Sequence, residues 1–157
     1  MNISEAGKEF IKQHEGLLTK AYRDGGGVLT IGYGHTGKDV YPDSEWCKGQ
    51  CDIAFEKDIQ HAQWCVNNSV LVELSQSQFD ALCSFVYNLG GYSLQTSTLL
   101  GKLNAGDYEG AAFEFKRWCH DNQKVVPGLL ARREGERRMF ISGTDISFAQ
   151  RIDRREV

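Results

Sequence analysis

The sequence predicts an α+β fold in which a small antiparallel β lobe, about residues 16–40, lies beside a larger, mainly helical lobe. Two short runs with strand character flank a Gly-rich turn at residues 24–27. Apolar residues recur with helical spacing before this region and again over about residues 43–141. A sheet of two or three strands is marginally stable alone, so it must pack on the helices.

Length and composition indicate one globular domain over residues 1–157. A chain of 157 residues with 41% hydrophobic and 25% charged residues can bury a sizeable core. The net charge of −3 argues against a nucleic-acid binder, which usually carries a basic excess. Residues 1–10 show no signal peptide, and no apolar run approaches the roughly 20 residues that span a bilayer. We expect a monomer without a membrane segment.

The N-terminal helix is predicted from Ser4 to His14. Ser4 is a suitable N-cap, and the negative charge of Glu5 in the first turn is favoured by the positive end of the helix dipole. Glu15 then stands at the end of the helix, and Gly16 fits the position that stops it.

Two strands are predicted next, over residues 18–23 and 28–33, joined by the turn that begins at Asp24. Gly32 and Gly34 indicate a bend or a close approach of another chain segment to the backbone. This β lobe ends before Pro42, which marks a boundary between elements.

The rest of the chain is predicted to be helical. Asp43 or Ser44 is expected to cap the first of these helices, Ser75 the second and Asp107 the fourth. The expected helices cover about residues 44–66, 76–89, 98–103, 108–119 and 128–140. The paired arginines of the last helix are predicted to form ion pairs at the surface, with Glu134 and Glu136 or with neighbouring helices.

The cysteine count is odd, so at least one thiol is unpaired within the chain. The spacing of Cys47 and Cys51 suggests a metal pair, but no second pair of ligands follows, and we predict no metal site. Cys83 lies in an apolar helical pattern and is predicted to be a core residue. Any disulfide pairing is left open among Cys47, Cys51, Cys65, Cys83 and Cys119.

Glu15, Asp24 and Thr30 form the candidate catalytic set. Breaking a glycosidic bond with water requires an acid for the leaving oxygen and a second group that activates the water. Carbonyls at the helix end favour a protonated Glu15, whereas free N–H groups in the glycine turn favour an ionised Asp24. Thr30, on the following strand, is placed to hold the water with Asp24. Taken singly, each residue also has an ordinary structural explanation.

The run from His14 to Gly37 resembles the phage-type lysozymes, the muramidases of glycoside hydrolase family 24. The pattern is Glu, eight residues, Asp, five residues, Thr and then IGYGHTG, which ends at Gly37. Later runs such as FDALCSFVYNLGG and VPGLLARREGERRMF also look like family segments, so the resemblance covers about residues 5–141. It implies a lysozyme-like fold with a glycan cleft between the two lobes.

The resemblance also implies a chemistry. Family members cleave the β-1,4 bond between N-acetylmuramic acid and N-acetylglucosamine in bacterial peptidoglycan, with no metal or cofactor. By resemblance Glu15 is the general acid, and Asp24 and Thr30 position a water for inversion at the anomeric carbon. Inversion requires carboxyl groups about 6.5–9.5 Å apart.

His35 and Tyr87 are the candidate substrate-binding residues. We expect His35 to brace the cleft by pairing with a carboxylate. Tyr87 either stacks on a sugar face or packs as a core aromatic residue, and the sequence leaves both open.

The leading hypothesis is therefore a phage or prophage endolysin, held in the host cytoplasm before lysis and acting on the periplasmic peptidoglycan. A lytic transglycosylase is an alternative, although it would need no positioned water. A secreted antibacterial muramidase would use the same chemistry. A catalytically silent glycan-binding module is disfavoured by the intact Glu15, Asp24 and Thr30 set.

Overall fold

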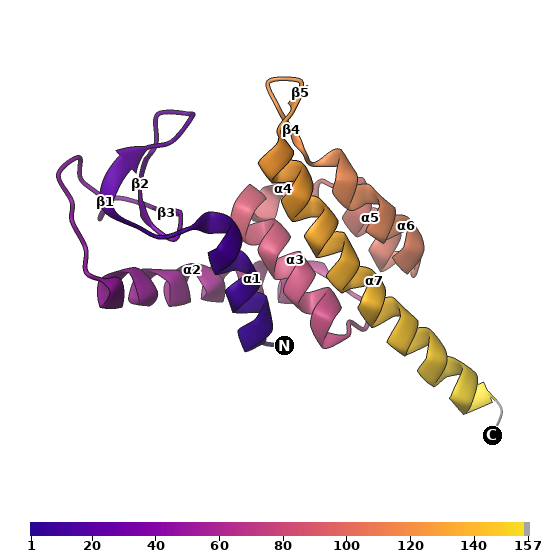
Figure 1. The fold of residues 1–157 in the computed structure, drawn as a ribbon. Coiled ribbons are helices and arrows are strands. Elements are labelled where there is room, and N and C mark those ends of the chain that lie inside the picture. Colours follow the sequence, from indigo (N-terminus) through magenta and orange to yellow (C-terminus); the bar gives the residue numbers. More distant parts are fainter. Residues whose placement is uncertain (156–157) are drawn as a thin grey trace.

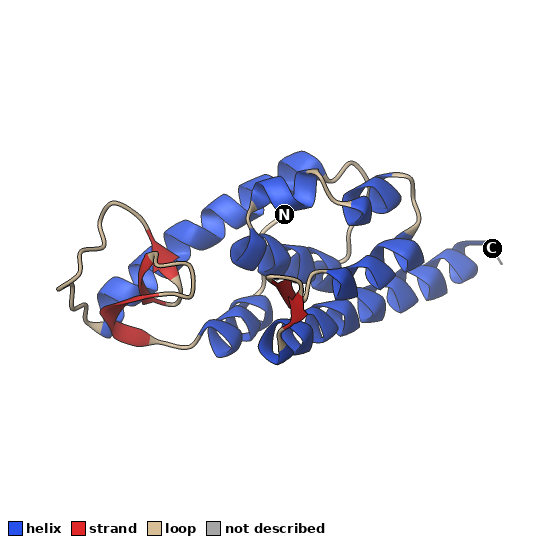
Figure 2. Cartoon of the chain, turned by 90° about the horizontal axis from the view of Figure 1, so that it is seen from above, coloured by secondary structure: helices blue, strands red, loops and turns tan. Residues whose placement is uncertain are grey.

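The computed structural model describes the backbone of residues 1–155 and the side chains of residues 1–143. A three-stranded sheet lies at one end, above the start of the long helix α2, and the other helices gather at the opposite end (Figures 1 and 2). The predicted α+β fold is therefore confirmed. The helices are α1 (Glu5–Glu15), α2 (Lys48–Ser69), α3 (Gln76–Leu89), α4 (Gly91–Gln95), α5 (Thr98–Asn104), α6 (Tyr108–Glu114) and α7 (Pro127–Arg155).

The β lobe is an antiparallel sheet of β1 (Leu18–Arg23), β2 (Leu29–Gly32) and β3 (His35–Thr36) in that order. Tyr22 on β1 is the cross-strand partner of Thr30 on β2. The pairing register of β1 with β2 shifts between Leu18 and Tyr22, so the ladder is irregular just before the Tyr22–Thr30 pair.

Helix α2 begins at Lys48, and the expected cap at Asp43 or Ser44 is wrong. The chain before α2 pairs instead with the free edge of β1, where the Ala21 N–H donates to the Ser44 carbonyl at 3.0 Å. The Trp46 N–H donates to the Thr19 carbonyl at 2.8 Å. Because backbone groups of Ser44 and Trp46 are hydrogen-bonded to β1, α2 begins only after this segment, at Lys48.

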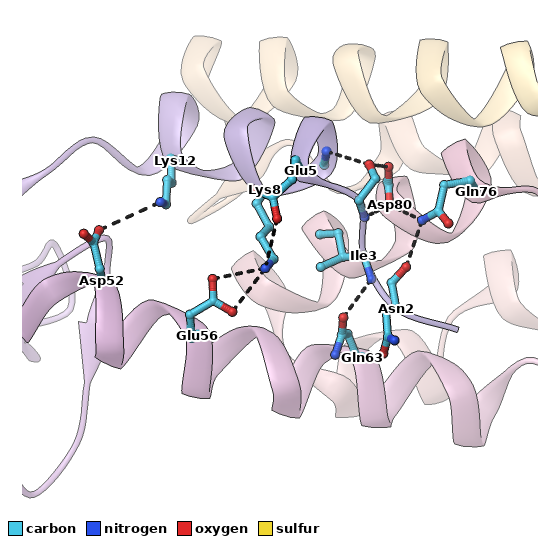
Figure 3. A network of polar contacts seen from close by, with 12 residues as sticks. Asn2, Ile3, Glu5, Lys8, Lys12, Asp52, Glu56, Gln63, Gln76 and Asp80 are labelled. Atoms are coloured by element: carbon cyan, nitrogen blue, oxygen red, sulfur yellow. Dashed lines mark hydrogen bonds and ion pairs between the residues drawn. The ribbon is translucent and has the colours of Figure 1, made fainter. Parts of the chain in front are cut away.

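Helix α1 follows its sequence signals. The Ser4 hydroxyl accepts from the Gly7 N–H at 3.1 Å, and Gly16 ends the helix with a φ of 71°. Ser4 also donates its hydroxyl proton to Asp80 of α3. Lys8 reaches Glu56 of α2 at 3.1 Å, so polar contacts hold α1 against both neighbouring helices (Figure 3).

Helix α3 is the centre of the helical lobe. Its residues 78–86 are all buried, and it packs against α1, α2 and α7. A reciprocal cap between Ser75 and Gln78 starts it, and Gly90 with a φ of 89° ends it, as the sequence predicts. The core around it includes Phe55, Phe79, Leu82, Phe85, Phe115 and Phe140.

The C-terminal third departs from prediction in three places. Asp107 caps α6 as expected, but this helix stops at Glu114 and continues as a 3₁₀ turn, Phe115–Arg117. A hairpin that the sequence did not predict follows, made of β4 (His120–Asp121) and β5 (Lys124–Val125). Helix α7 also extends past its expected end at residue 140.

The five cysteines are free thiols. Cys47 is exposed and is the N-cap residue of α2. Cys83 is a core residue, as predicted, and burial raises the pKa of its thiol. Over the described residues, none of the helices combines the length and the apolar character that crossing a membrane requires.

Candidate active site

Glu15 is the last residue of α1, at the junction between that helix and the β lobe. Its side chain is 15% exposed and lies directly against Gly34, where a Cβ atom would collide with Glu15 Oε2. Gly34 has a φ of 73°, a conformation that favours glycine. The bend expected from the glycines of the IGYGHTG run therefore serves to admit the Glu15 carboxyl group.

The nearest charge to Glu15 is Arg132 of α7. Its Nη1 atom donates to Glu15 Oε1 at 2.5 Å, across 117 residues of sequence. Sequence reasoning took the carbonyls at the end of α1 as the main electrostatic influence, and this ion pair corrects that view. Arg132 is 4% exposed, so the prediction of a surface ion pair at this position is also wrong.

Arg132 is itself held by groups below the site. Its Nη2 atom donates to the Ser84 carbonyl at 3.2 Å, and its Nε atom lies 3.5 Å from Glu136 Oε2. Arg133 and Glu136 are fully buried and pair with each other, so they too depart from the predicted surface arrangement. The guanidinium that touches Glu15 thus has fixed partners on two helices.

Asp24 lies in an exposed turn rich in N–H donors, as predicted. Its Oδ1 atom accepts from the Gly26 and Val28 N–H groups, each at 2.9 Å. The Asp24 N–H donates to the Val28 carbonyl at 3.0 Å and closes the turn. These bonds fix the orientation of the carboxylate while it remains in contact with solvent.

Thr30 is 4% exposed, and its hydroxyl donates to the Val28 carbonyl at 2.9 Å. Asp24 and Thr30 therefore both bond to the backbone of Val28, which places them around the same residue. A hydroxyl that donates its proton in this way keeps its oxygen lone pairs as acceptors.

Tyr22 lies beside the candidate catalytic residues, a position that the sequence analysis missed. It is 38% exposed and stands opposite Thr30 in the sheet. Burial raises the pKa of its phenol, and the charges of Glu15 and Asp24 raise it further. Tyr22 is thus a common neighbour of the two candidate catalytic carboxylates. Its position two residues before Asp24 is the only sequence signal that pointed to it.

His35 pairs with two carboxylates rather than the single one expected. Its Nδ1 atom is 2.7 Å from Asp58 Oδ2, and its Nε2 atom is 2.9 Å from Asp39 Oδ1. Burial lowers the pKa of His35, but the hydrogen bonds with Asp39 and Asp58 outweigh it and raise the pKa overall. Because Asp58 belongs to α2, His35 ties the β lobe to the long helix.

Tyr87 packs as a core aromatic residue and also lines a hollow beside the candidate site. Its ring packs on Phe55, with centroids 5.6 Å apart, and its hydroxyl donates to the Tyr33 carbonyl at 2.5 Å. It also lines a hollow of about 220 Å³ that begins at Gly34, beside Glu15. The other lining residues include Thr36, Asp58, His61, Val86 and Gly90.

The family of the chain follows from its similarity to known proteins. A sequence model described as phage lysozyme matches residues 12–136. The chain belongs to the phage lysozyme family. This confirms the resemblance found in the sequence, and the match includes Glu15, Asp24, Thr30, His35, Tyr87 and Arg132.

Individual relatives support the assignment. An endolysin of Bacillus phage B103 is 46% identical over 91% of the chain, which spans only 55% of that protein. An endolysin of Acyrthosiphon pisum secondary endosymbiont phage 1 is 40% identical over 90% of the chain and 99% of that protein. The muramidase domain of SpmX from Asticaccaulis excentricus superposes with a TM-score of 0.82 at 34% identity, covering 88% of the chain and 97% of the domain.

Proposed function

We propose that this phage lysozyme family member is an endolysin that hydrolyses the β-1,4 bond between N-acetylmuramic acid and N-acetylglucosamine in peptidoglycan. The observation that carries the proposal is the setting of Glu15. Its carboxyl group is held between Arg132 and Gly34 at the edge of the hollow. Endolysins of similar length and sequence are its relatives.

Glu15 is the general acid in this proposal. It protonates the leaving glycosidic oxygen, which requires a carboxyl group held in one orientation at the bond. The contacts with Arg132 and Gly34 restrict the carboxyl group in this way, since one oxygen faces each of them. No metal or cofactor takes part in the proposed step.

Asp24 and Thr30 position the attacking water. Asp24 Oδ1 is occupied by two backbone N–H groups, so the carboxylate is already oriented before substrate arrives. The Thr30 oxygen accepts a hydrogen bond from one O–H of the water, which stays on the product, and Asp24 takes the other proton as the water oxygen attacks the anomeric carbon. Attack from the face opposite the leaving group inverts the configuration.

His35 and Tyr87 contribute to substrate binding. Tyr87 offers its ring to the hollow beside Gly34, where a sugar would lie. His35 acts through Asp58, which also lines the hollow. We propose that the enzyme works as a monomer, waits in the host cytoplasm and acts on the periplasmic wall.

Clearing of outer-membrane-permeabilised Gram-negative cells tests the proposal. Wild-type protein is expected to clear the suspension, whereas folded Glu15→Gln and Asp24→Asn variants lose nearly all activity. Near-normal turnover by folded Glu15→Gln would contradict the acid role. Circular dichroism and thermal unfolding supply the control for folding.

The released muropeptides separate hydrolysis from lytic transglycosylation. Mass spectrometry is expected to find reducing ends, because a positioned water is the nucleophile. Anhydro ends would instead favour the transglycosylase. A secreted antibacterial muramidase would give the same reducing products, so this alternative is distinguished only by genomic context.

A further inference from the structure

A buried carboxylate lies behind the ion pair of the proposed acid. Glu136 of α7 is fully buried, and its Oε2 atom accepts from the Ser84 hydroxyl at 2.5 Å. Arg133 Nε is 2.7 Å from Glu136 Oε1, and its Nη2 atom donates to Oε2 at 3.0 Å. A buried charge with this many partners is a built feature and not a chance surface contact.

The same carboxylate also reaches Arg132. Arg132 Nε lies 3.5 Å from Glu136 Oε2 and donates to the Ser84 hydroxyl at 3.3 Å, while Nη1 donates to Glu15. The guanidinium of Arg132 therefore stands between two carboxylates, one facing the proposed substrate and one in the core. A negative charge on Glu136 behind Arg132 reduces the net positive potential that acts on Glu15.

We propose that Glu136 is a positioning residue, which acts on Glu15 through Arg132 by balancing part of the guanidinium charge and, with Ser84, fixing its orientation. The inference rests on the proposed function, since Glu15 is there the general acid. An unbalanced Arg132 would bind an ionised Glu15 too firmly and hold the acid in its deprotonated form. With Glu136 in place, less net positive charge faces the Glu15 carboxyl group, which in the proposed step must give a proton to the leaving oxygen.

The elements packed around Glu15, Arg132 and Glu136 contribute further titratable groups. They are His14 on α1, Tyr22 on β1, Tyr87 on α3, and Arg133 on α7. Burial lowers the pKa of His14, and the charges of Arg132 and Arg133 lower it further, so His14 adds little positive charge near neutral pH. The phenols stay neutral because burial raises the pKa of both tyrosines. Burial raises the pKa of Glu136, against the opposing charges of Arg133 and Arg132. Arg132, Arg133 and Glu136 are the remaining charged groups in this chain of contacts to Glu15.

Two substitutions of opposite sign test the proposal. Glu136→Gln removes the negative charge, whereas Arg133→Met removes a positive charge that pairs with the same carboxylate but forms no hydrogen bond or ion pair with Glu15. The alkaline limb of the pH profile of wall hydrolysis reports loss of the acid's proton. We expect Glu136→Gln to move this limb to lower pH by roughly one unit, and Arg133→Met to move it to higher pH.

A purely structural role predicts a different result. Both variants would then lose activity in proportion to lost stability, at all pH values and with an unchanged midpoint. The proposal would be overturned if the midpoint of the alkaline limb stayed unchanged in both variants, or if it moved in the same direction in both. If Glu136→Gln does not fold, Ser84→Ala removes the hydroxyl shared by Arg132 and Glu136, and we expect a smaller displacement to lower pH. An unchanged midpoint in folded Ser84→Ala would equally reject the proposal.

Failure of the proposed function gives a separate signature. A folded wild type that releases no muropeptides would reject the hydrolase, and with it the catalytic part of this inference. An active wild type with undisplaced variants would reject only the role of Glu136. Carboxyl ¹³C NMR of Glu15 follows the same titration without substrate, and its midpoint is expected to move in the same two directions.

Discussion

His35 Nδ1 lies 2.7 Å from Asp58 Oδ2, and this contact joins the β lobe to α2. The other ring nitrogen binds Asp39 within the segment after β3. Asp58 also lines the hollow beside Gly34. One imidazole therefore controls both how the sheet sits on the helix and where a wall residue of the proposed cleft stands.

The first prediction concerns the pH dependence of stability. The pKa of His35 is raised in the folded protein. Its ion pairs therefore contribute fully to the free energy of unfolding below the ordinary pKa of about 6.5, and this contribution is lost as pH rises through the pKa of the folded state. The hydrogen bond to His35 lowers the pKa of Asp39, so its contribution is present above about 3.9 and is lost as pH falls. The contact between His35 and Asp39 therefore stabilises the fold most between about pH 3.9 and 6.5.

Urea unfolding of wild type and His35→Asn at a series of pH values measures this effect. We expect the difference in free energy of unfolding to be largest between about pH 4 and 6.5 and to shrink on both sides. Asp39→Asn serves as a partial control, because His35 keeps its partner Asp58. A difference that does not vary with pH would contradict the assignment.

The second prediction concerns the contact between Gly34 and Glu15. Gly34→Ala places a methyl group against Glu15 Oε2 and should displace the proposed acid. We expect wall hydrolysis to fall roughly 100-fold, as for other misplaced catalytic groups. Gly106→Ala is the matched control, because its φ of 85° carries the same backbone penalty of about 1–2 kcal/mol with no atom within 4 Å. Equal activity in the two variants would show that the contact does not matter.

The third prediction concerns Arg132. Arg132→Met removes the partner of Glu15 while keeping an unbranched apolar stem, so the carboxyl group loses its orientation. We expect a loss of activity of roughly 100-fold with the binding of wall fragments largely kept. The control is Arg138→Met on the exposed side of α7, which should remain close to wild type. Arg132→Met with full activity would remove Arg132 from the site.

The fourth prediction separates two roles of Ser4. Its oxygen caps α1 and its proton goes to Oδ2 of the buried Asp80, so Ser4→Ala removes the partner of the Gly7 N–H and the hydrogen bond to that oxygen, while Asp80 Oδ1 keeps its donors. We expect a loss of about 2–3 kcal/mol in the free energy of unfolding. Asp107→Ala removes only an exposed cap of α6 and should cost about 1 kcal/mol. Equal losses in urea unfolding would mean that the Asp80 contact contributes nothing.

Local chemistry explains why much of the fold was predictable. Ser4 and Gly16 bound α1, and Ser75 and Gly90 bound α3, through hydrogen bonds or backbone angles within a few residues. The turn at Asp24 is equally local, because its carboxylate binds N–H groups two and four residues later. Family resemblance then singled out Glu15, Asp24 and Thr30, whose catalytic roles stay predictions.

Packing decided what local chemistry could not. Asp43 and Ser44 are good caps, but the edge of β1 took their segment into backbone pairing and α2 began later. The hairpin of β4 and β5 depends on Asn122 and Gln123, both with positive φ, and only Asn favours that conformation.

The sequence by itself determined the order of most elements, the ends of α1 and α3, and the run that carries Glu15 and Asp24. Only the tertiary structure decided that Arg132 and Glu136 leave the surface and stand behind Glu15. The physical reason is separation along the chain. Caps and turns form between neighbours, whereas a buried ion pair 117 residues apart exists only after α7 has packed against α3.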